Sequence, residues 1–254
     1  MQNVVVLVPT RHEAGNVTVL AQALSDVLGP TGLDWGVVFV DDSDDETVDV
    51  LRGLAARDPH VGVVHRPAGA RDGGLSGAVL AGVAATSSRW IVVMDGDLQH
   101  PPAVVPALLA PLVAGTADVS VASRYCPGGS PGGLSGPVRK FVSSSSRTLV
   151  RTAFPRVRGV TDPLGGFFAF ERSVVSGVEL RPEGFKILLE LLARGRWDRV
   201  AEVPFAFASR LDGASKASVR EGLRFLRHVA RLSLAPVPAP VGVSPVASFT
   251  HQAA

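Results

Sequence analysis

Residues Trp90–His100 read WIVVMDGDLQH and join an apolar run to a cluster of polar side chains. The run Ile91–Met94 has the length and β-branched content of a buried strand. It ends at Asp95-Gly96-Asp97, and Pro101-Pro102 stops the chain from continuing as a strand. Two carboxylates at the end of a buried strand can share one divalent cation, to which Gln99 can add a neutral oxygen. The alternative is an acidic surface turn, because Asp and Gly are common in turns.

The sequence on both sides of this stretch alternates between strand and helix patterns. Further strands are predicted at Val4–Val8, Trp35–Val40, Val61–His65, Val119–Ala122, within Asp162–Phe170, and at Arg199–Pro204. Helices are predicted at Val17–Leu28, Glu46–Arg57, before Ala85, and at Val138–Phe154, Gly184–Leu192 and Val219–Leu232. This order predicts an α/β fold with a mostly parallel central sheet flanked by helices.

Acidic residues are expected to gather at one rim of this sheet, where the carboxyl ends of the strands meet and ligands bind. They are Glu13, Asp41, Asp42, Asp95 and Asp97. Five carboxylates at one rim repel each other unless a cation or hydrogen-bond donors compensate them. This convergence predicts a binding site. The glycine-rich segment Gly73–Gly77 lacks the Lys-Ser/Thr of a phosphate loop, which argues against a dinucleotide-binding fold.

The composition limits the classes of function that fit the chain. Its 254 residues are 46% hydrophobic and carry a net charge of +2, with basic residues that are not interleaved with aromatics, so we expect no nucleic-acid partner. The single cysteine, Cys126, excludes an internal disulfide. No signal peptide is expected. The uncharged run Pro101–Ala117 holds four prolines and predicts a buried helix rather than a membrane span.

The predicted helix Val219–Leu232 is amphipathic and ends the expected domain, residues 1–232. Its apolar row is Val219, Leu223, Leu226 and Ala230, widened by Phe225, Val229 and Leu232, and its basic row is Arg220, Arg224, Arg227 and Arg231. One interpretation is a surface helix with a solvated Arg face. The other is a helix at an anionic membrane surface. The Pro- and Ala-rich segment 233–254 is expected to be a disordered tail.

Several motifs together resemble one known family. They are VLVPTRHEAGNV (Val6–Val17), VDDS (Val40–Ser43), MDGDLQHPP (Met94–Pro102), SRY (Ser123–Tyr125), GFKILLELL (Gly184–Leu192) and FASRLDGASK (Phe207–Lys216). In this order they resemble the dolichol- and polyprenol-phosphate mannosyltransferases of glycosyltransferase family 2. The resemblance covers about Val4–Leu232 and implies a GT-A fold, which is Rossmann-like.

The resemblance implies inverting transfer of mannose from GDP-mannose to a polyprenyl phosphate, with Mg²⁺ or Mn²⁺ as cofactor. The nucleotide-sugar pocket would include Pro9, Glu13, Asp41, Asp42, Asp95 and Lys216, and the metal would be held by Asp95, Asp97 and Gln99. The lipid phosphate would be bound by Arg124, Arg139 and Ser143, and the catalytic residues would be Asp97, Arg124 and Arg210.

The resemblance also implies a peripheral protein at the cytoplasmic face of a membrane, alone or with a separate membrane protein as partner. Helices near 184–192 and 219–232 would face the lipid. The chain departs from the family at Arg11-His12, where Tyr-Asn is usual, and at Asp72, where a basic residue is common. These departures keep a second donor open, UDP-glucose or another sugar nucleotide. A non-catalytic nucleotide-sugar or lipid-phosphate binding module is the alternative of another class, and a damaged metal site would indicate it.

Overall fold

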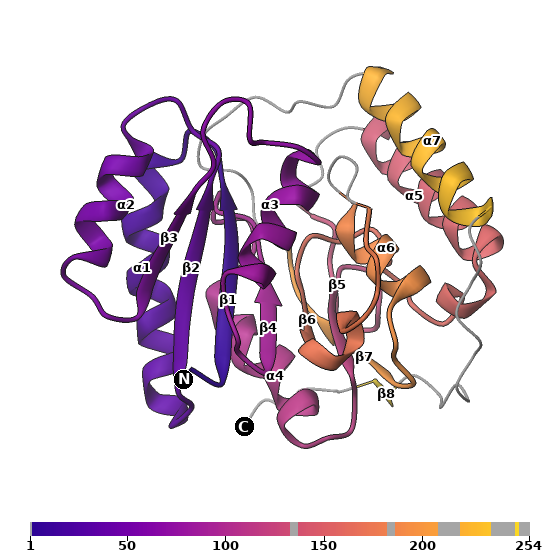
Figure 1. The fold of residues 1–254 in the computed structure, drawn as a ribbon. Helices are drawn as coiled ribbons and strands as arrows, with labels where there is room; N and C mark the ends of the chain where they lie inside the picture. Colours follow the sequence, from indigo (N-terminus) through magenta and orange to yellow (C-terminus); the bar gives the residue numbers. More distant parts are fainter. Residues whose placement is uncertain (1, 133–136, 182–185, 208–218, 235–246, 249–254) are drawn as a thin grey trace.

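The computed structural model describes residues 2–132, 137–181, 186–207, 219–234 and 247–248. Within them the chain forms one sheet with helices on both faces (Figure 1). The predicted site residues Arg210 and Lys216 lie outside the described residues, as do the side chains of Arg139 and Ser143.

The sheet has eight strands in the order β3-β2-β1-β4-β6-β5-β7-β8. The strands are β1 (Val4–Thr10), β2 (Trp35–Asp41), β3 (Val61–His65), β4 (Trp90–Val93), β5 (Val119–Ser123), β6 (Phe168–Glu171), β7 (Val200–Pro204) and β8 (Ala247–Ser248). Among these described strands β6 alone runs antiparallel to its neighbours, β4 and β5. The predicted mostly parallel sheet is therefore confirmed.

The helices cover the two faces of the sheet. They are α1 (Ala14–Leu28), α2 (Thr47–Ala55), α3 (Gly74–Ala84), α4 (Val105–Val113), α5 (Pro137–Ala153), α6 (Ile187–Arg194) and α7 (Val219–Leu234), with 3₁₀ turns at Gly29–Thr31, Pro102–Val104, Pro155–Val157 and Arg172–Val175. Side chains alternate along a strand, so Val4, Val6 and Val8 of β1 share a core with α1, α2 and α4. Val5 and Leu7 face the other core, which α3, α5, α6 and α7 cover.

Small residues let α3 lie directly against the sheet. A Cβ added at Gly82 would meet the side chains of Leu7 and Val40 at 3.0 Å. The close approach explains why a helix of Gly, Ala and Val follows β3. The glycine-rich segment Gly73–Gly77 lies at the start of α3 and near the carboxyl end of β2, where Arg66 donates to both Asp42 and the Gly74 carbonyl oxygen.

The burial of α6 and α7 corrects two expectations about the membrane. Residues 187–193 of α6 are all buried inside the protein, so the expected lipid contact of helix 184–192 is wrong for this part. In α7, Val229 and Leu232 are buried, whereas Leu226, assigned to the main apolar row, is 51% exposed. The buried face of α7 thus carries Val229 and Leu232, which were expected only to widen the apolar row.

Two residues of the expected tail form a short strand within the described part of the chain. Ala247–Ser248 pairs in parallel with β7, and the rest of the expected tail beyond Leu234 lies outside the described residues. The domain boundary at 232 therefore stays a prediction.

No helix within the described ranges is long and apolar enough to cross a membrane.

Candidate active site

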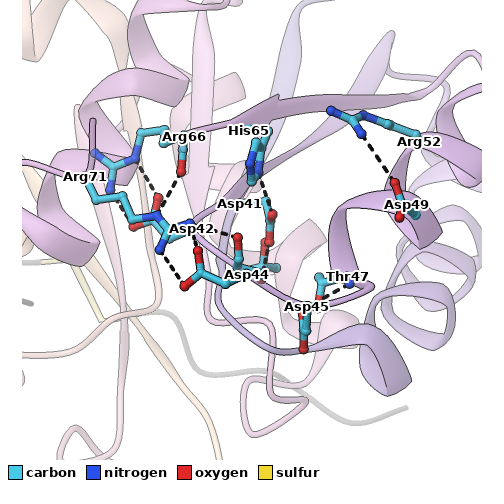
Figure 2. Close-up of polar contacts among 12 residues, drawn as sticks. Asp41, Asp42, Asp44, Asp45, Thr47, Asp49, Arg52, His65, Arg66 and Arg71 are labelled. Carbon is cyan, nitrogen blue, oxygen red and sulfur yellow. Dashed lines mark hydrogen bonds and ion pairs between the residues drawn. The ribbon is translucent and has the colours of Figure 1, made fainter. Parts of the chain in front are cut away.

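The carboxyl ends of β1, β2 and β3 place Thr10, Asp41 and His65 in one row. The strand register pairs Thr10 with Asp41 and Asp41 with His65. The Asp41 carboxylate is fully buried and accepts hydrogen bonds from Thr10 Oγ1 at 3.2 Å and from Ser43 Oγ. His65 Nδ1 lies 2.9 Å from the second oxygen of Asp41 (Figure 2). Both oxygens of Asp41 therefore have partners inside the protein.

Asp42 is held by a buried arginine. Arg66 donates to both oxygens of Asp42, from Nε at 2.8 Å and from Nη2 at 2.6 Å (Figure 2). Arg66 also donates to the carbonyl oxygens of Asp72 and Gly74. A paired, charge-assisted contact of this kind is strong and fixes direction. It ties the glycine-rich segment to the end of β2.

A second ion pair lies beside the first. Arg71 donates to both oxygens of Asp44 at 2.6 and 2.9 Å and to the carbonyl oxygen of Ser43 (Figure 2). The hydrogen bond from Arg71 holds the pKa of the Asp44 carboxyl below its usual value. The five carboxylates of the rim were expected to need compensation, and protein side chains already provide it for Asp41 and Asp42. This half of the rim is suited to a neutral or polar ligand part such as a nucleoside.

The loop between β1 and α1 is tied to the end of β2. The backbone N–H of His12 donates to Ser43 Oγ at 2.9 Å, and that of Glu13 donates to Thr47 Oγ1 at 3.1 Å. His12 has φ +60°, a conformation that is uncommon for a residue with a side chain. The Glu13 carboxylate accepts from Asn16 Nδ2 at 2.6 Å. The departure at Arg11-His12 therefore sits on a backbone that is well fixed.

The predicted metal residues follow β4. The Asp95 side chain is 37% exposed, whereas Gln99 is buried. Asp97 Oδ1 accepts the backbone N–H of Gln99 at 3.1 Å, across a strained Leu98 with φ +60°. Two carboxylates and one amide are hard oxygen donors, which suit Mg²⁺ or Mn²⁺ and leave coordination positions for a phosphate. Within the described part of the chain, no group of three His, Cys, Asp or Glu side chains could hold a metal ion.

A buried histidine holds the backbone of the turn that carries the predicted metal residues. His100 Nδ1 accepts the backbone N–H of Asp95 at 3.0 Å, and its ring stacks on Phe167 at 5.0 Å between centroids. Burial lowers the pKa of His100 to about 4, so the ring is neutral near pH 7. Because Nδ1 accepts, the proton of the neutral ring is on Nε2.

Arg124 stands at the carboxyl end of β5, where the motif SRY predicted it. Its Nε and Nη2 donate to the two oxygens of Asp162 at 2.7 and 2.9 Å. Burial disfavours the charge on Arg124, but the hydrogen bonds from Arg124 to Asp162 outweigh it, and the pKa of the guanidinium is raised. Arg124 is therefore a permanent cation whose one edge is already occupied.

Lys186 is a second cation in the same half of the rim. Its Nζ donates to the carbonyl oxygen of Leu164 at 3.0 Å. Burial, and then the charge of Arg124, lower the pKa of Lys186 to about 8, while Asp162 and Asp95 oppose the shift. Below that pH it is a cation near both Asp95, a predicted metal ligand, and Arg124.

Analysis of the sequence did not single out Asp162, Lys186, His100 or Arg66. Three of them lie inside stretches that were noted, His100 in MDGDLQHPP, Asp162 in DPLGGFFAF and Lys186 in GFKILLELL. The partners of Asp162, Lys186 and Arg66 lie 38, 22 and 24 residues away, so no local pattern indicates these contacts, whereas His100 meets the backbone of Asp95 five residues away. The structure joins Asp95, Asp97 and Gln99 in one turn and Asp41 and Asp42 in another, with Pro9 and Thr10 at the end of β1 between β2 and β4.

A mostly parallel sheet with an Asp-Gly-Asp turn after its fourth strand, next to a row of polar groups at the strand ends, has the architecture of a GT-A glycosyltransferase. The family model described as glycosyl transferase family 2 matches residues 5–178. The chain belongs to glycosyl transferase family 2, and the predicted GT-A fold is confirmed.

Curated relatives resemble the chain over most of its length. A Pyrococcus furiosus protein named dolichol-phosphate mannosyltransferase is 40% identical over 229 residues, which are 89% of this chain and 62% of that protein. The Saccharomyces cerevisiae protein of the same name is 33% identical over 237 residues, 89% of this chain and 85% of that protein. The chain thus spans less than two thirds of the Pyrococcus relative.

The solved structures that resemble the chain agree on the fold. One is glucosyl-3-phosphoglycerate synthase from Mycobacterium tuberculosis in complex with Mn²⁺, UDP-glucose and phosphoglyceric acid. It superposes with a TM-score of 0.63 at 21% identity, over 92% of this chain and 79% of that one.

Proposed function

We propose that the chain transfers mannose from GDP-mannose to a polyprenyl phosphate of the dolichyl type. The observation that carries this proposal is the 40% identity, over 89% of the chain, to a protein named dolichol-phosphate mannosyltransferase. The strand-end site supports it, because an acidic turn that can hold a metal ion lies near two partly buried cations, Arg124 and Lys186, which can bind phosphate groups.

In the proposed reaction an oxygen of the lipid phosphate attacks the anomeric carbon of the sugar. The new bond forms on the face opposite the leaving GDP, so the configuration inverts while the bond from carbon to the diphosphate oxygen breaks. A phosphate monoester is already ionised near pH 7, so no strong general base is needed. The charge that develops on the leaving diphosphate is the part that the enzyme must stabilise.

The donor side of the site is assigned to the ends of β1, β2 and β4. Pro9, Glu13, Asp41 and Asp42 would line the nucleoside pocket, and Asp95 would lie at the diphosphate. The ion pair of Asp42 with Arg66 keeps this part of the wall rigid and offsets the charge of Asp42. Lys216, outside the described residues, is assigned to the donor phosphates.

Asp95, Asp97 and Gln99 are proposed to hold a divalent cation, Mg²⁺ or Mn²⁺. When bound, such an ion would offset the negative charge of the diphosphate. Asp97 Oδ1 already accepts the backbone N–H of Gln99, which fixes the Asp97 side chain on this turn. His100, neutral and buried, holds the Asp95 backbone without adding a competing charge.

The acceptor side is assigned to the end of β5 and to α5. Arg124, Arg139 and Ser143 would bind the lipid phosphate, and Arg210 would act with Asp97 and Arg124 in catalysis. Arg124 is the member of this group whose surroundings are described, and it is a partly buried cation whose pKa is raised in part by the charge of Asp95.

We further propose that the protein is peripheral at the cytoplasmic face of a membrane, with α7 toward the lipid, alone or with a separate membrane protein. The support is an exposed Leu226 directly followed by an exposed Arg227 on a helix whose opposite face is buried. An apolar side chain beside cations suits an anionic membrane surface.

The test is sugar transfer in vitro with purified protein, polyprenyl phosphate and Mg²⁺ or Mn²⁺. GDP-mannose and UDP-glucose are supplied in parallel, and the lipid fraction is analysed by mass spectrometry. Mannosyl lipid with GDP-mannose alone is the expected result. Glucosyl lipid with UDP-glucose alone would show that the donor is UDP-glucose and leave the proposed mechanism unchanged. Metal-dependent donor binding without any product would point to another acceptor or a missing membrane partner, and no donor binding at all would favour a non-catalytic module.

A further inference from the structure

The orientation in which Arg124 can bind a phosphate is restricted by its contacts with Asp162. Its Nε–H and one N–H of Nη2 are taken by the two oxygens of Asp162, and its own backbone N–H donates to Asp162 Oδ2 at 3.2 Å. Three of the five guanidinium N–H groups remain, two on Nη1 and one on Nη2. All three lie on the side away from Asp162, so an anion can bind Arg124 from that end only.

Two aromatic rings limit the remaining freedom of the guanidinium. The central carbon of Arg124 lies 5.5 Å from the ring centre of Tyr125 and 5.3 Å from that of Phe207. Contacts of a guanidinium with aromatic faces are attractive, more so where water is excluded. The carboxylate and the rings together hold the plane and the direction of Arg124.

Asp162 is itself anchored by a second buried carboxyl group. Its backbone N–H donates to Glu202 Oε1 at 3.3 Å, and both the N–H and the Oγ1 of Thr161 donate to the same oxygen at 2.9 and 2.8 Å. Asp162 is 1% exposed and Glu202 is 3% exposed. Asp162 thus offers a fixed carboxylate instead of a mobile surface charge.

We propose that Asp162 is a positioning residue, which aims the free end of Arg124 at the phosphate of the acceptor. The proposal rests on the function proposed above for Arg124. A carboxylate beside a substrate-binding cation lowers the net positive charge of the site and so weakens its attraction for an anion. The contribution of Asp162 to binding must therefore come from the orientation that it gives to the Arg124 guanidinium. Asp95 attracts Arg124 as well, since its charge contributes to the raised pKa of Arg124. Asp162 prevents Arg124 from turning toward Asp95 and forming an ion pair with this proposed metal ligand.

The test compares Asp162→Asn, Arg124→Ala and the double variant with the unmodified chain. The probe is a short isoprenyl monophosphate, and its Kd is measured by calorimetry, with GDP as a second ligand and mannosyl transfer as a third readout. The control is Asp118→Asn. Asp118 also accepts two backbone N–H groups, at 2.9 Å each, and pairs with an arginine, but it lies at the amino end of β5.

We expect Asp162→Asn to weaken isoprenyl phosphate binding by about 10- to 100-fold, because a misplaced binding group loses that much. GDP binding should change less than about twofold, and Asp118→Asn should leave both constants unchanged. The double variant should bind no more weakly than Arg124→Ala, since a residue that acts through Arg124 has nothing to add once Arg124 is gone. A purely structural role would instead weaken both ligands and give additive losses.

Unchanged isoprenyl phosphate binding in folded Asp162→Asn, or additive losses in the double variant, would overturn the inference. If Asp162→Asn does not fold, Arg124→Lys is the second variant, because lysine cannot span both oxygens of Asp162. Wild-type phosphate affinity in Arg124→Lys would then overturn it. An unmodified chain that binds the probe but transfers no sugar contradicts the proposed function alone. One that does not bind the probe contradicts both.

Discussion

At the scale of single residues, the charges of the site are compensated in two different ways. Asp42 and Asp44 are paired with Arg66 and Arg71, so the charges of these two carboxylates are offset inside the protein. Asp95 keeps a partly exposed carboxylate next to His100, which burial keeps neutral. The negative charge that a metal can use is therefore concentrated after β4.

The first prediction concerns Asp97. Replacing Asp97 by Ala should remove one of two carboxylates from the metal site and lower metal-dependent turnover at least about 100-fold, because a bound cation contributes several kcal/mol. Turnover is measured against the concentrations of Mg²⁺ and Mn²⁺. Asp26→Ala, an exposed aspartate on α1, is the control and should be fully active. Unchanged metal dependence in Asp97→Ala would contradict the assignment.

The second prediction concerns the pH dependence of stability through His100. The folded-state pKa of about 4 lies below the usual 6.5, so between these values the unfolded chain binds a proton that the folded chain does not. The contribution of neutral His100 is present above pH 6.5 and is lost as the pH falls toward 4.

Urea unfolding between pH 4 and 6.5 measures this effect. In His100→Asn the free energy of unfolding should fall less steeply with decreasing pH, by up to about 1.4 kcal/mol per pH unit for one proton. His60→Asn is the control, since His60 is an exposed residue next to Asp58. Parallel curves for His100→Asn and the unmodified chain would show that His100 does not titrate differently in the folded state.

At the scale of elements, one turn connects both halves of the candidate site. The segment DPLGG, residues 162–166, contacts Arg124 through Asp162 and Lys186 through the Leu164 carbonyl. Its last residue, Gly166, lies against the metal side, where an added Cβ would be 3.3 Å from both oxygens of Asp95. The antiparallel strand β6 begins directly after this turn, which is why the turn reaches the rim at all.

The third prediction follows from Gly166. In Gly166→Ala the methyl group should displace the Asp95 carboxylate by a few tenths of an ångström, and Mn²⁺ should bind about tenfold more weakly because its ligands tolerate little misplacement. Electron paramagnetic resonance of free Mn²⁺ measures the affinity directly. Gly53→Ala on α2 is the matched control, since an added Cβ there meets nothing closer than 3.9 Å. Equal Mn²⁺ affinity in the two variants would exclude a role for this close contact.

At the scale of the whole molecule, different helices cover the two faces of the sheet. One core packs α1, α2 and α4, and the other packs α3, α5, α6 and α7 (Figure 1). The proposed membrane contact belongs to the second face and to α7, since α6 is buried within it. Both faces carry exposed apolar residues, which allows them to be compared.

The fourth prediction compares those faces. Leu226→Asp on α7 should weaken binding to vesicles with anionic lipid about tenfold, because it loses the burial of a Leu side chain and adds a negative charge. Val19→Asp on α1 is the control, because Val19 is 55% exposed and Leu226 is 51% exposed. Vesicle sedimentation measures both. Equal binding of the two variants would contradict the assignment of α7 to the membrane.

The fold and half of the site could be predicted from local patterns. Short continuous apolar runs predicted β1 to β5. The sequence after β4 also predicted that Asp95, Asp97 and Gln99 lie together, because such close neighbours share one turn whatever the rest of the chain does. The limits of elements were less accurate. The helix α1 begins at Ala14 rather than Val17, since Glu13 and Asn16 close its first turn through contacts that apolar periodicity does not record.

The sequence by itself determined the α/β class, the mostly parallel sheet and the rim on which the polar residues gather, because these depend on the order and period of neighbouring residues. Only the tertiary structure decided which charges meet. Arg66 is 24 residues from Asp42, and Asp162 is 38 residues from Arg124. Such pairs form once the strands have aligned, so no local pattern specifies them. The same alignment buried α6 and left Leu226 of α7 exposed.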